Sequence, residues 1–539
     1  MRLLRRVLFW VFVVLYLTVC PLMVFYAFGY WFTSGATGGL VKTGLIYLST
    51  APPGASVYVG NRRYTQPTPT ILRDLVPGEY PIRLVLKDHQ PWTQTVPVEA
   101  EKATVLEHVL LLPRAFGRDM LVPEASEQLM PVAGTHLLLL ASGPTLEDLS
   151  VYDAKHQTHW PLLPPESPFQ RAKLVSHAMV TGSSSVFLRV ATPDGERFLW
   201  VELKPEANRI EDLTHLFPEV PRLVVWDVSD RRWFFALHAD SLNRVDLTSK
   251  ALYPKWVEHV LGVGVFDRTV SVVSSDGQIA RMDLDGRPTG LTPDEDRLPA
   301  TLTGSLESLQ LHPVTKKRFL MLSENGALLT NCEPYRLVEN GVVGLEVDAK
   351  RERALVWQKH ALGVVELLRT RKGEGTDEGV TLRWVFTSYH GEAPPSQTGP
   401  VPTSWNGAGR SGGPVPEGSS PKPPLLGFAK QSRGGTGFTH GGKIEQAFWV
   451  FEGSHILFRD GDRVWLVELE TYGTPHLAEL LRVKRGSDVA YDESTGRLLY
   501  LDRDTGFLTS LDVVPQQEIV LLPFPERREE RMPIHVQAP

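Results

Sequence analysis

The feature that most constrains the fold is a short unit that recurs eight times after residue 113. In each unit an apolar strand is followed by a turn and a second strand that ends in an acidic residue. The fifth unit, with its second strand at residues 327–330, lacks the acid, and the others carry Asp153, Glu202, Asp246, Asp283, Glu366, Glu468 and Asp512. The first three intervals are 49, 44 and 37 residues. A period of about 40–45 residues with four strands per unit is typical of a β-propeller.

Turn signals agree with this interpretation. Hairpin dipeptides such as Asp194-Gly195 and Asp276-Gly277 separate the apolar strands, and helical periodicity is nearly absent here. We therefore predict an all-β fold with a β-propeller over residues 114–525. It has about eight blades, or seven if one unit is irregular or the two ends share a blade. The repeated acids should accept hydrogen bonds from backbone and arginine donors, because an active site would not recur in every unit.

An uncharged apolar segment covers residues 7–32. It exceeds the roughly 20 residues that a helix needs to cross a bilayer, and aromatic residues gather at its far end. Pro21 would kink such a helix without preventing it. We predict a transmembrane helix. The alternatives are a signal peptide cleaved near Ser34-Gly35-Ala36, a lipoprotein with Cys20 as the modified residue, and a buried core helix.

Charge sets the orientation of this helix. Arg2, Arg5 and Arg6 precede it, whereas the first basic residue after it is Lys42. The positive-inside rule places residues 1–6 in the cytoplasm and the chain beyond the helix outside. The expected location is the inner (cytoplasmic) membrane, crossed once, with the bulk of the chain periplasmic or extracellular. Residues 33–39 are small and polar, and residues 33–43 should form a flexible stalk.

Residues 44–113 contain short strand patterns between proline and glycine turns, which is typical of a small β-sandwich. Their order resembles the PEGA domain: Pro53-Gly54-Ala55 follows the first strand, Val57-Tyr58-Val59-Gly60 is the second, and Leu75-Val76-Pro77-Gly78-Glu79-Tyr80 precedes a strand ending at Leu86. Asp88-His89-Gln90-Pro91-Trp92 stands where the family often has a glycine and an aromatic residue. The resemblance implies an extracytoplasmic, surface-associated accessory module and brings no catalytic residues.

Composition excludes several function classes. A net charge of -6 disfavours nucleic-acid binding, which needs a basic face. Two cysteines, Cys20 and Cys332, make no disulfide framework and cannot build a cysteine-based zinc site. Residues 389–443, rich in proline, glycine and serine, are expected to form a disordered insert in the propeller. Residues 526–539 begin with mixed charges and should be a solvated tail.

Several motifs match catalytic or metal-binding patterns without the necessary context. Gly409-Arg410-Ser411-Gly412-Gly413 matches a nucleophile elbow and, with Gly407, a dinucleotide-binding glycine pattern, but no helix follows it. His156 and His159 would point to opposite faces of a strand. His440 lies at the end of the expected insert. Two further motifs supply too few oxygens for calcium and indicate turns: Asp283-Leu284-Asp285-Gly286 and Asp502-Arg503-Asp504-Thr505-Gly506.

Six tryptophans could stack on sugar rings, but most lie in apolar strands and are expected in the core: Trp160, Trp200, Trp226, Trp233, Trp357 and Trp384. We assign no catalytic, cofactor-binding or metal residue. The chain is predicted to be a non-enzymatic, membrane-anchored envelope protein whose propeller face binds an envelope protein or a cell-wall polysaccharide. The alternative is a periplasmic propeller hydrolase or carbohydrate-active enzyme, which requires acids, histidines or a metal to converge at the propeller mouth.

Overall fold

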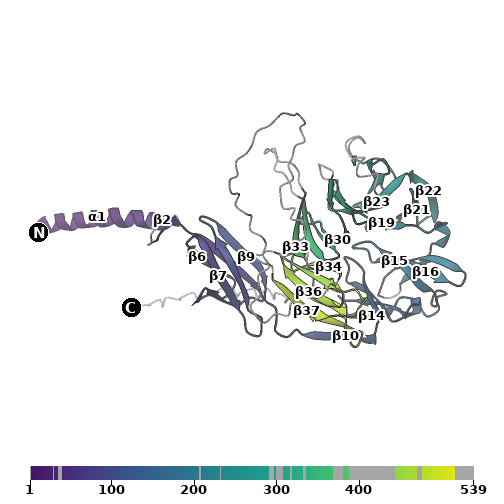
Figure 1. Ribbon diagram of the computed structural model, residues 1–539, viewed down its shortest axis with the longest axis horizontal. Helices are drawn as coiled ribbons and strands as arrows, with labels where there is room; N and C mark the ends of the chain where they lie inside the picture. Colours follow the sequence, from purple (N-terminus) through teal and green to yellow (C-terminus); the bar gives the residue numbers. More distant parts are fainter. Residues whose placement is uncertain are drawn as a thin grey trace, which may run out of the picture.

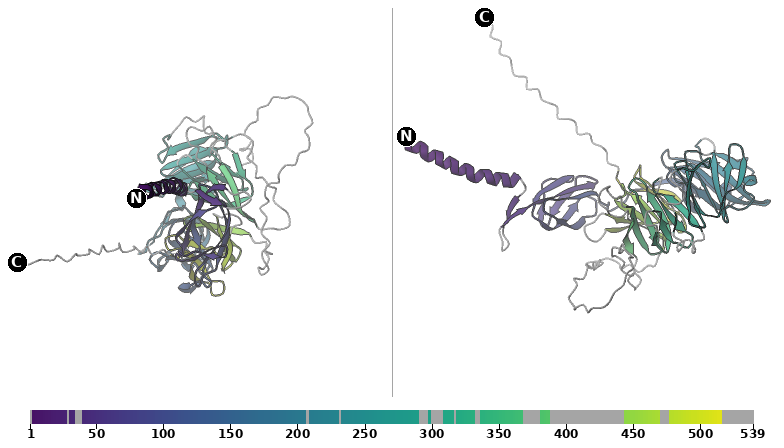
Figure 2. Two further views of the ribbon diagram at one scale, coloured as in Figure 1. Left: turned by 90° about the vertical axis from the view of Figure 1, so that its left-hand side faces the viewer. Right: turned by 90° about the horizontal axis from the view of Figure 1, so that it is seen from above.

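The computed structural model describes residues 2–27, 30–33, 39–205, 208–230, 232–289, 297–298, 308–315, 318–331, 336–367, 380–387, 443–469 and 476–515. A helix, a small β-sandwich and a ring of sheets follow one another, with the sandwich between the helix and the ring (Figure 1 and Figure 2). The expected insert, apart from Lys443, and the expected tail lie outside the described residues, as do Cys332, Ser411 and His440.

Helix α1 (Arg2–Ala27) forms over the apolar segment and extends away from the sandwich, with the side chains of Leu8 and Trp10 more than half exposed (Figure 1). The predicted helix continues to residue 32, whereas the chain instead forms β1 (Tyr30–Thr33), which pairs with β2 (Gly39–Lys42). The aromatic residues of β1 favour extended backbone. No helix in the described part of the chain combines the length and hydropathy needed to cross a bilayer. The transmembrane prediction is therefore not confirmed.

The sandwich follows the hairpin and consists of two sheets. Most of its strands bury alternate side chains, and Ile46, Leu72, Ile82 and Val96 meet between the sheets. The first sheet has the order β6 (Thr70–Leu75), β3 (Gly44–Ala51) and β9 (Ala103–Leu110). The second has the order β5 (Arg62–Arg63), β4 (Ser56–Val59), β7 (Gly78–Val85) and β8 (Trp92–Val98).

The ring begins with three four-stranded antiparallel sheets in sequence order. The first contains β11 (Gln128–Pro131), β12 (Leu137–Ala141), β13 (Leu149–Asp153) and β14 (Thr158–Pro161). The second contains β15 (Lys173–Met179), β16 (Ser185–Thr192), β17 (Gly195–Glu202) and β18 (Arg209–Asp212). The third contains β19 (Leu223–Trp226), β20 (Trp233–His238), β21 (Ser241–Asp246) and β22 (Ala251–Glu258). Two 3-10 turns, η1 (Leu146–Asp148) and η2 (Thr214–Leu216), lie in connections.

A seven-stranded sheet comes next and divides into two antiparallel groups. Among the described residues, the two groups pair in parallel through Gly262 with Leu309 and Val263 with Gln310. The first group contains β23 (Val260–Phe266), β24 (Thr269–Ser274) and β25 (Ile279–Asp283). The second contains β26 (Leu309–Pro313), β27 (Phe319–Ser323), β28 (Leu328–Thr330) and β29 (Arg336–Glu339).

Three further four-stranded sheets complete the ring. The first contains β30 (Val342–Asp348), β31 (Arg353–Gln358), β32 (Ala361–Leu367) and β33 (Val380–Thr387). The second contains β34 (Ile444–Val450), β35 (His455–Asp460), β36 (Arg463–Glu468) and β37 (Leu477–Arg482). The third, here named the closing sheet, joins β38 (Ala490–Asp492), β39 (Arg497–Leu501) and β40 (Phe507–Asp512) to β10 (Arg118–Ala125) from the beginning of the ring.

Apolar cores lie between successive sheets. On β20, Phe234 packs toward the β15–β18 sheet, whereas Trp233 and Phe235 pack toward β23–β25, because neighbouring side chains of a strand point to opposite faces. The same arrangement recurs around the ring. Tyr152 of the first sheet and Leu499 of the closing sheet share the final core. The ring is therefore closed, and the all-β prediction is confirmed.

Candidate functional site

The repeated acids occupy equivalent places, as the sequence predicts. Each lies at the end of the third strand of its sheet or group, or in the case of Glu366 one residue before it, directly opposite the residue that begins the second strand. The pairs are Leu137 with Asp153, Ser185 with Glu202, Trp233 with Asp246, Thr269 with Asp283, Arg353 with Glu366, His455 with Glu468 and Arg497 with Asp512. Because the topology is the same in every case, these strand-end acids lie on one face of the ring.

Three of the aspartates hold the turn that follows them. Asp153 Oδ1 accepts the backbone N–H of Lys155 at 2.8 Å, and Asp283 Oδ1 accepts that of Arg287 at 2.7 Å. Asp246 Oδ1 accepts the N–H of Thr248 at 2.8 Å. Its other oxygen accepts Arg232 Nε at 3.0 Å, which holds the pKa of Asp246 well below its usual range. The expected backbone and arginine donors are present, so these acids serve the fold.

The fifth unit replaces the acid with an amide. Leu320 pairs with Thr330, so Phe319, the first residue of β27, faces Asn331. The backbone N–H of Phe319 donates to Asn331 Oδ1 at 2.7 Å. A search for carboxylates misses this position, although an asparagine oxygen accepts a backbone hydrogen bond as a carboxylate oxygen does.

Glu468 has the strand-end position but a different donor. Trp92 Nε1, from β8 of the sandwich, donates to Glu468 Oε2 at 3.0 Å. Both residues are buried. A hydrogen bond from a neutral donor to a buried carboxylate is strong because the surroundings have a low dielectric. This strand-end acid therefore binds the sandwich.

Further contacts surround this bond, and together they form the junction between the sandwich and the ring. His476 Nε2 and Gln94 Oε1 lie 2.9 Å apart, and the rings of His476 and Trp92 have centroids 5.4 Å apart. On the other side, His108 Nε2 lies 3.4 Å from Glu452 Oε2. Apolar packing adds to these polar contacts, since Ala51 and Leu110 join the core between the β34–β37 sheet and the closing sheet.

A serine and a histidine are adjacent inside the junction. Ser454 Oγ lies 2.9 Å from His455 Nδ1, and both side chains are buried, beside Glu468 and residues 105–109. Burial lowers the pKa of His455 to about 3, with the nearby His108 and His476 adding to the shift. Ser454 Oγ also donates to the carbonyl of Phe451 at 2.7 Å. The pair resembles a nucleophile and base, but the sandwich covers it, so it packs the junction.

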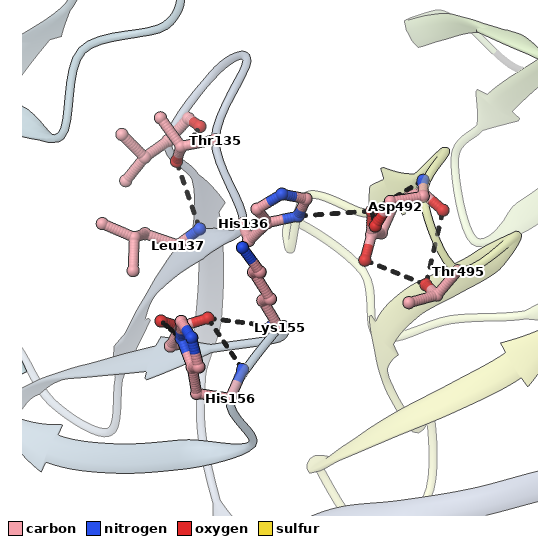
Figure 3. Close-up of polar contacts among 10 residues, drawn as sticks. Thr135, His136, Leu137, Lys155, His156, Asp492 and Thr495 are labelled. Carbon is pink, nitrogen blue, oxygen red and sulfur yellow. Dashed lines mark hydrogen bonds and ion pairs between the residues drawn. The ribbon is translucent and has the colours of Figure 1, made fainter.

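Two histidine–aspartate pairs lie near the seam between the first sheet and the closing sheet (Figure 3). His136 Nδ1 is 3.3 Å from Asp492 Oδ1, and His156 Nδ1 is 2.7 Å from Asp153 Oδ2. Both imidazoles are exposed, by 40% and 60%, whereas both carboxylates are buried. This arrangement orients an imidazole for acid–base chemistry. The hydroxyl of Thr495 donates to Asp492 at 2.9 Å and so serves the carboxylate.

Burial alone would raise the pKa of Asp153. The hydrogen bonds from the His156 ring and from the backbone N–H groups of His156 and Lys155 outweigh that effect, so the pKa of Asp153 is lowered. This carboxylate therefore stays ionised beside His156 at neutral pH.

His156 and His159, which the sequence pattern disfavours as a metal-binding pair, have different neighbours in the structure. His156 lies in a turn bound to Asp153, whereas His159 lies on β14 opposite Tyr152. The described residues contain no group of three or more histidine, cysteine or acidic side chains that could hold a metal ion. Asp502 binds the backbone N–H of Asp504 at 3.1 Å, which is the predicted turn.

Most of the tryptophans lie in strands that face a neighbouring sheet, as expected. Trp200 and Trp226 are buried in the core between the β15–β18 and β19–β22 sheets, and Trp233 lies in the next core. Trp160 and Trp357 are partly buried against the cores of their own sheets. Trp384 is partly buried on β33.

Comparison with known proteins defines the class. Residues 43–111 match the PEGA domain family, so the sandwich is a PEGA domain. No curated protein matches the sequence. The closed ring of small antiparallel sheets is the arrangement typical of a β-propeller, so the chain combines a PEGA domain with a β-propeller fold.

Three of the solved structures that resemble this chain show how similar they are to it in sequence and in fold. BamB from Moraxella catarrhalis is 10% identical with a TM-score of 0.36, covering 74% of this chain and 99% of that one. The carboxy-terminal WD40 domain of Sif2 is 10% identical with a TM-score of 0.39, covering 73% and 98%. YCF48 from Cyanidioschyzon merolae is 12% identical with a TM-score of 0.35, covering 73% and 98%.

Proposed function

We propose that this protein is a non-enzymatic binding or scaffold protein of the bacterial cell envelope. Its propeller presents a face to another envelope protein or to a cell-wall polymer. Most of the strand-end acids bind the backbone of a turn or an arginine side chain. This supports a structural role for them and not a catalytic one. The described residues form eight inter-sheet cores, which support an eight-bladed ring if β23–β25 and β26–β29 are counted as separate blades.

The observation that carries this proposal is the junction. Trp92, Gln94 and Leu110 of the sandwich are all engaged by the ring, so the two parts form one continuous packed body. A flexible tether would let a propeller search for partners in all directions. A packed junction fixes which face the propeller presents, and this suits a scaffold or a docking platform.

Attachment to the inner membrane is the second part of the proposal. Helix α1 exposes large apolar side chains such as Leu8, Trp10 and Leu17. Water-exposed apolar surface of this extent is unfavourable, and a lipid environment would remove the cost. Arg2, Arg5 and Arg6 at its amino-terminal end favour a cytoplasmic location for that end and a periplasmic or extracellular location for the propeller.

The alternative function is hydrolysis of an envelope polymer. The specific observation in its favour is the pair of exposed imidazoles, His136 and His156, each beside a buried carboxylate. Removal of both imidazoles would abolish a hydrolytic activity but leave a scaffold's binding by other surfaces intact.

The test combines fractionation with binding. The full chain is expected to remain with membranes after carbonate extraction, and a chain lacking residues 2–27 should be released. Detergent-solubilised protein should co-sediment with isolated cell envelopes without releasing soluble sugar or peptide. Release of such products, and its loss in the His136→Gln/His156→Gln variant but not in a His159→Gln control, would replace the scaffold proposal with the enzymatic one. Recovery of the full chain in the soluble fraction would contradict membrane attachment and leave the scaffold proposal standing.

A further inference from the structure

The ring is closed by a strand that comes directly from the sandwich. Strand β10 forms the edge of the closing sheet and pairs with β40. Its register shifts twice, between Met120 and Val122 and between Val122 and Ala125. Each shift interrupts the ladder of backbone hydrogen bonds. The edge strand that completes the ring is therefore irregularly paired.

The connection that leads to β10 is bound to the sandwich along its length. The backbone N–H of Leu111 donates to the carbonyl of Ala51 at 2.9 Å, and that of Arg114 donates to Asp88 at 2.9 Å. The N–H of Gln90 donates to the carbonyl of Leu112 at 2.8 Å. The start of β10 is thus positioned by the sandwich.

The same connection contributes to the ring's interior. Leu112 and Phe116 pack, partly buried, against the core between the β34–β37 sheet and the closing sheet, where Ala51 and Leu110 of the sandwich are buried. Farther along, Val122 of β10 is buried in the core between the closing sheet and the first sheet. Residues from the sandwich through β10 therefore span two successive seams of the ring.

We propose that the docked sandwich is a latch on ring closure. In this proposal one continuous segment runs from the sandwich through the connection to β10. The junction holds its first end on the ring, and pairing with β40 holds its second end. While Trp92 is bound to Glu468, β10 is held at the edge where it completes the closing sheet. When the junction opens, β10 loses this support, and the ring opens between the closing sheet and the first sheet before any other seam.

Hydrogen exchange with mass spectrometry on the full detergent-solubilised chain tests this latch. Trp92→Phe keeps an aromatic ring but removes the indole N–H that Glu468 accepts. We expect amide exchange in β10 to rise by about tenfold, the effect of losing one buried hydrogen bond to a charged group. Exchange in the β19–β22 sheet should stay at its wild-type rate.

Trp226→Phe is the matched control. Trp226 Nε1 donates to Ser183 Oγ at 3.1 Å, also buried and also between two units, but at the seam between the β15–β18 and β19–β22 sheets. This variant should speed exchange at that seam and leave β10 unchanged. Gln94→Ala removes the contact with His476 and gives a milder opening of the junction if Trp92→Phe does not fold. Unchanged exchange of β10 in the junction variants, or a uniform rise around the ring, overturns the latch.

Discussion

At the scale of single residues, the most unusual group is Glu346 on β30. Its Oε2 atom is buried and has no hydrogen-bond partner among the described residues. Burial, the first cause, together with the charges of Asp348 and Glu493 raises the pKa of Glu346 to about 8, despite a hydrogen bond from the backbone of Trp449. The side chain is therefore protonated at neutral pH, in the seam between the β30–β33 and β34–β37 sheets.

This protonation makes stability depend on pH. The carboxyl ionises near pH 4.5 in the unfolded chain and near pH 8 in the fold. Between these values the folded state holds a proton that the unfolded state has lost, so the free energy of unfolding falls as pH rises. Relative to Glu346→Gln, the wild type should lose on the order of 3 kcal/mol from pH 4.5 to 8 and then level off. Urea unfolding at several pH values measures this, and Glu346→Leu, which also cannot ionise, should follow the Gln variant's pH profile. If the free energy of unfolding changed with pH in the same way for the wild type and for Glu346→Gln, the protonation of Glu346 would not be the cause.

The strand-end acids differ from one another in burial and in the donors that they bind. Asp246 is buried and accepts bonds from Arg232 and from the backbone, whereas Glu366, at the equivalent place, is exposed. Asp246→Ala should therefore lower the free energy of unfolding by about 1–3 kcal/mol, because it leaves donors unpaired. Glu366→Ala should change it by less than about 0.5 kcal/mol. Equal losses in thermal or denaturant unfolding would show that position in the sheet, and not the bonded donors, sets the cost.

At the scale of elements, the spacing of the repeated units and the turn dipeptides predicted the sheets of the ring well. The reason is that side chains alternate between the two faces of every strand, and each sheet buries both faces. The sequence did not predict the hairpin of β1 and β2, because the aromatic residues of β1 continue an apolar segment that also suits a helix. It also missed the role of Asn331, since the repeat was defined by carboxylates and the structure needs only an oxygen acceptor.

The fifth unit yields a prediction at this scale. Asn331→Asp should keep the hydrogen bond from Phe319 and restore the acid that the other units carry. Asn331→Ala leaves the buried N–H of Phe319 without its acceptor and should cost about 1–2 kcal/mol of unfolding free energy. Denaturant unfolding of the two variants compares them directly. An Asp variant less stable than the Ala variant would contradict the equivalence of the position.

At the scale of the whole molecule, the decisive contacts are those that no local pattern reveals. Trp92 and Glu468 are 376 residues apart, and Gln94 and His476 are 382 apart. The sequence predicted the sandwich and the ring separately. It gave no signal that one strand-end acid of seven would bind the sandwich, because Glu468 has the same local sequence as its equivalents. The histidine–aspartate pair at Asp492 likewise joins the two ends of the ring.

The junction should weaken in acid. Burial lowers the pKa of His476 below 6.5, and His455 is lowered further. Released from the junction, these imidazoles would take up protons near pH 6.5, so docking is fully stable above that pH and loses stability as pH falls. Small-angle scattering should show a larger radius of gyration at pH 5 than at pH 7.5. His476→Gln, which can keep a polar contact with Gln94 but cannot titrate, should reduce that change. An identical expansion in both proteins would exclude His476 as the cause.

The strand that closes the ring also dictates an order of events during translation. Strand β10 leaves the ribosome first among the ring's strands, and β40, its partner, leaves last. Until β36 is made, Trp92 lacks the Glu468 carboxylate that accepts its N–H. Until β40 is made, β10 has an unpaired edge, and Ala51 and Leu110 lack part of the core that covers them. A nascent or truncated chain therefore displays an open strand edge beside an apolar patch, features that bind chaperones and proteases. Glu468 covers Trp92 first and β40 pairs with β10 afterwards, so the last of the ring's described strands to be made is the one that hides the open edge.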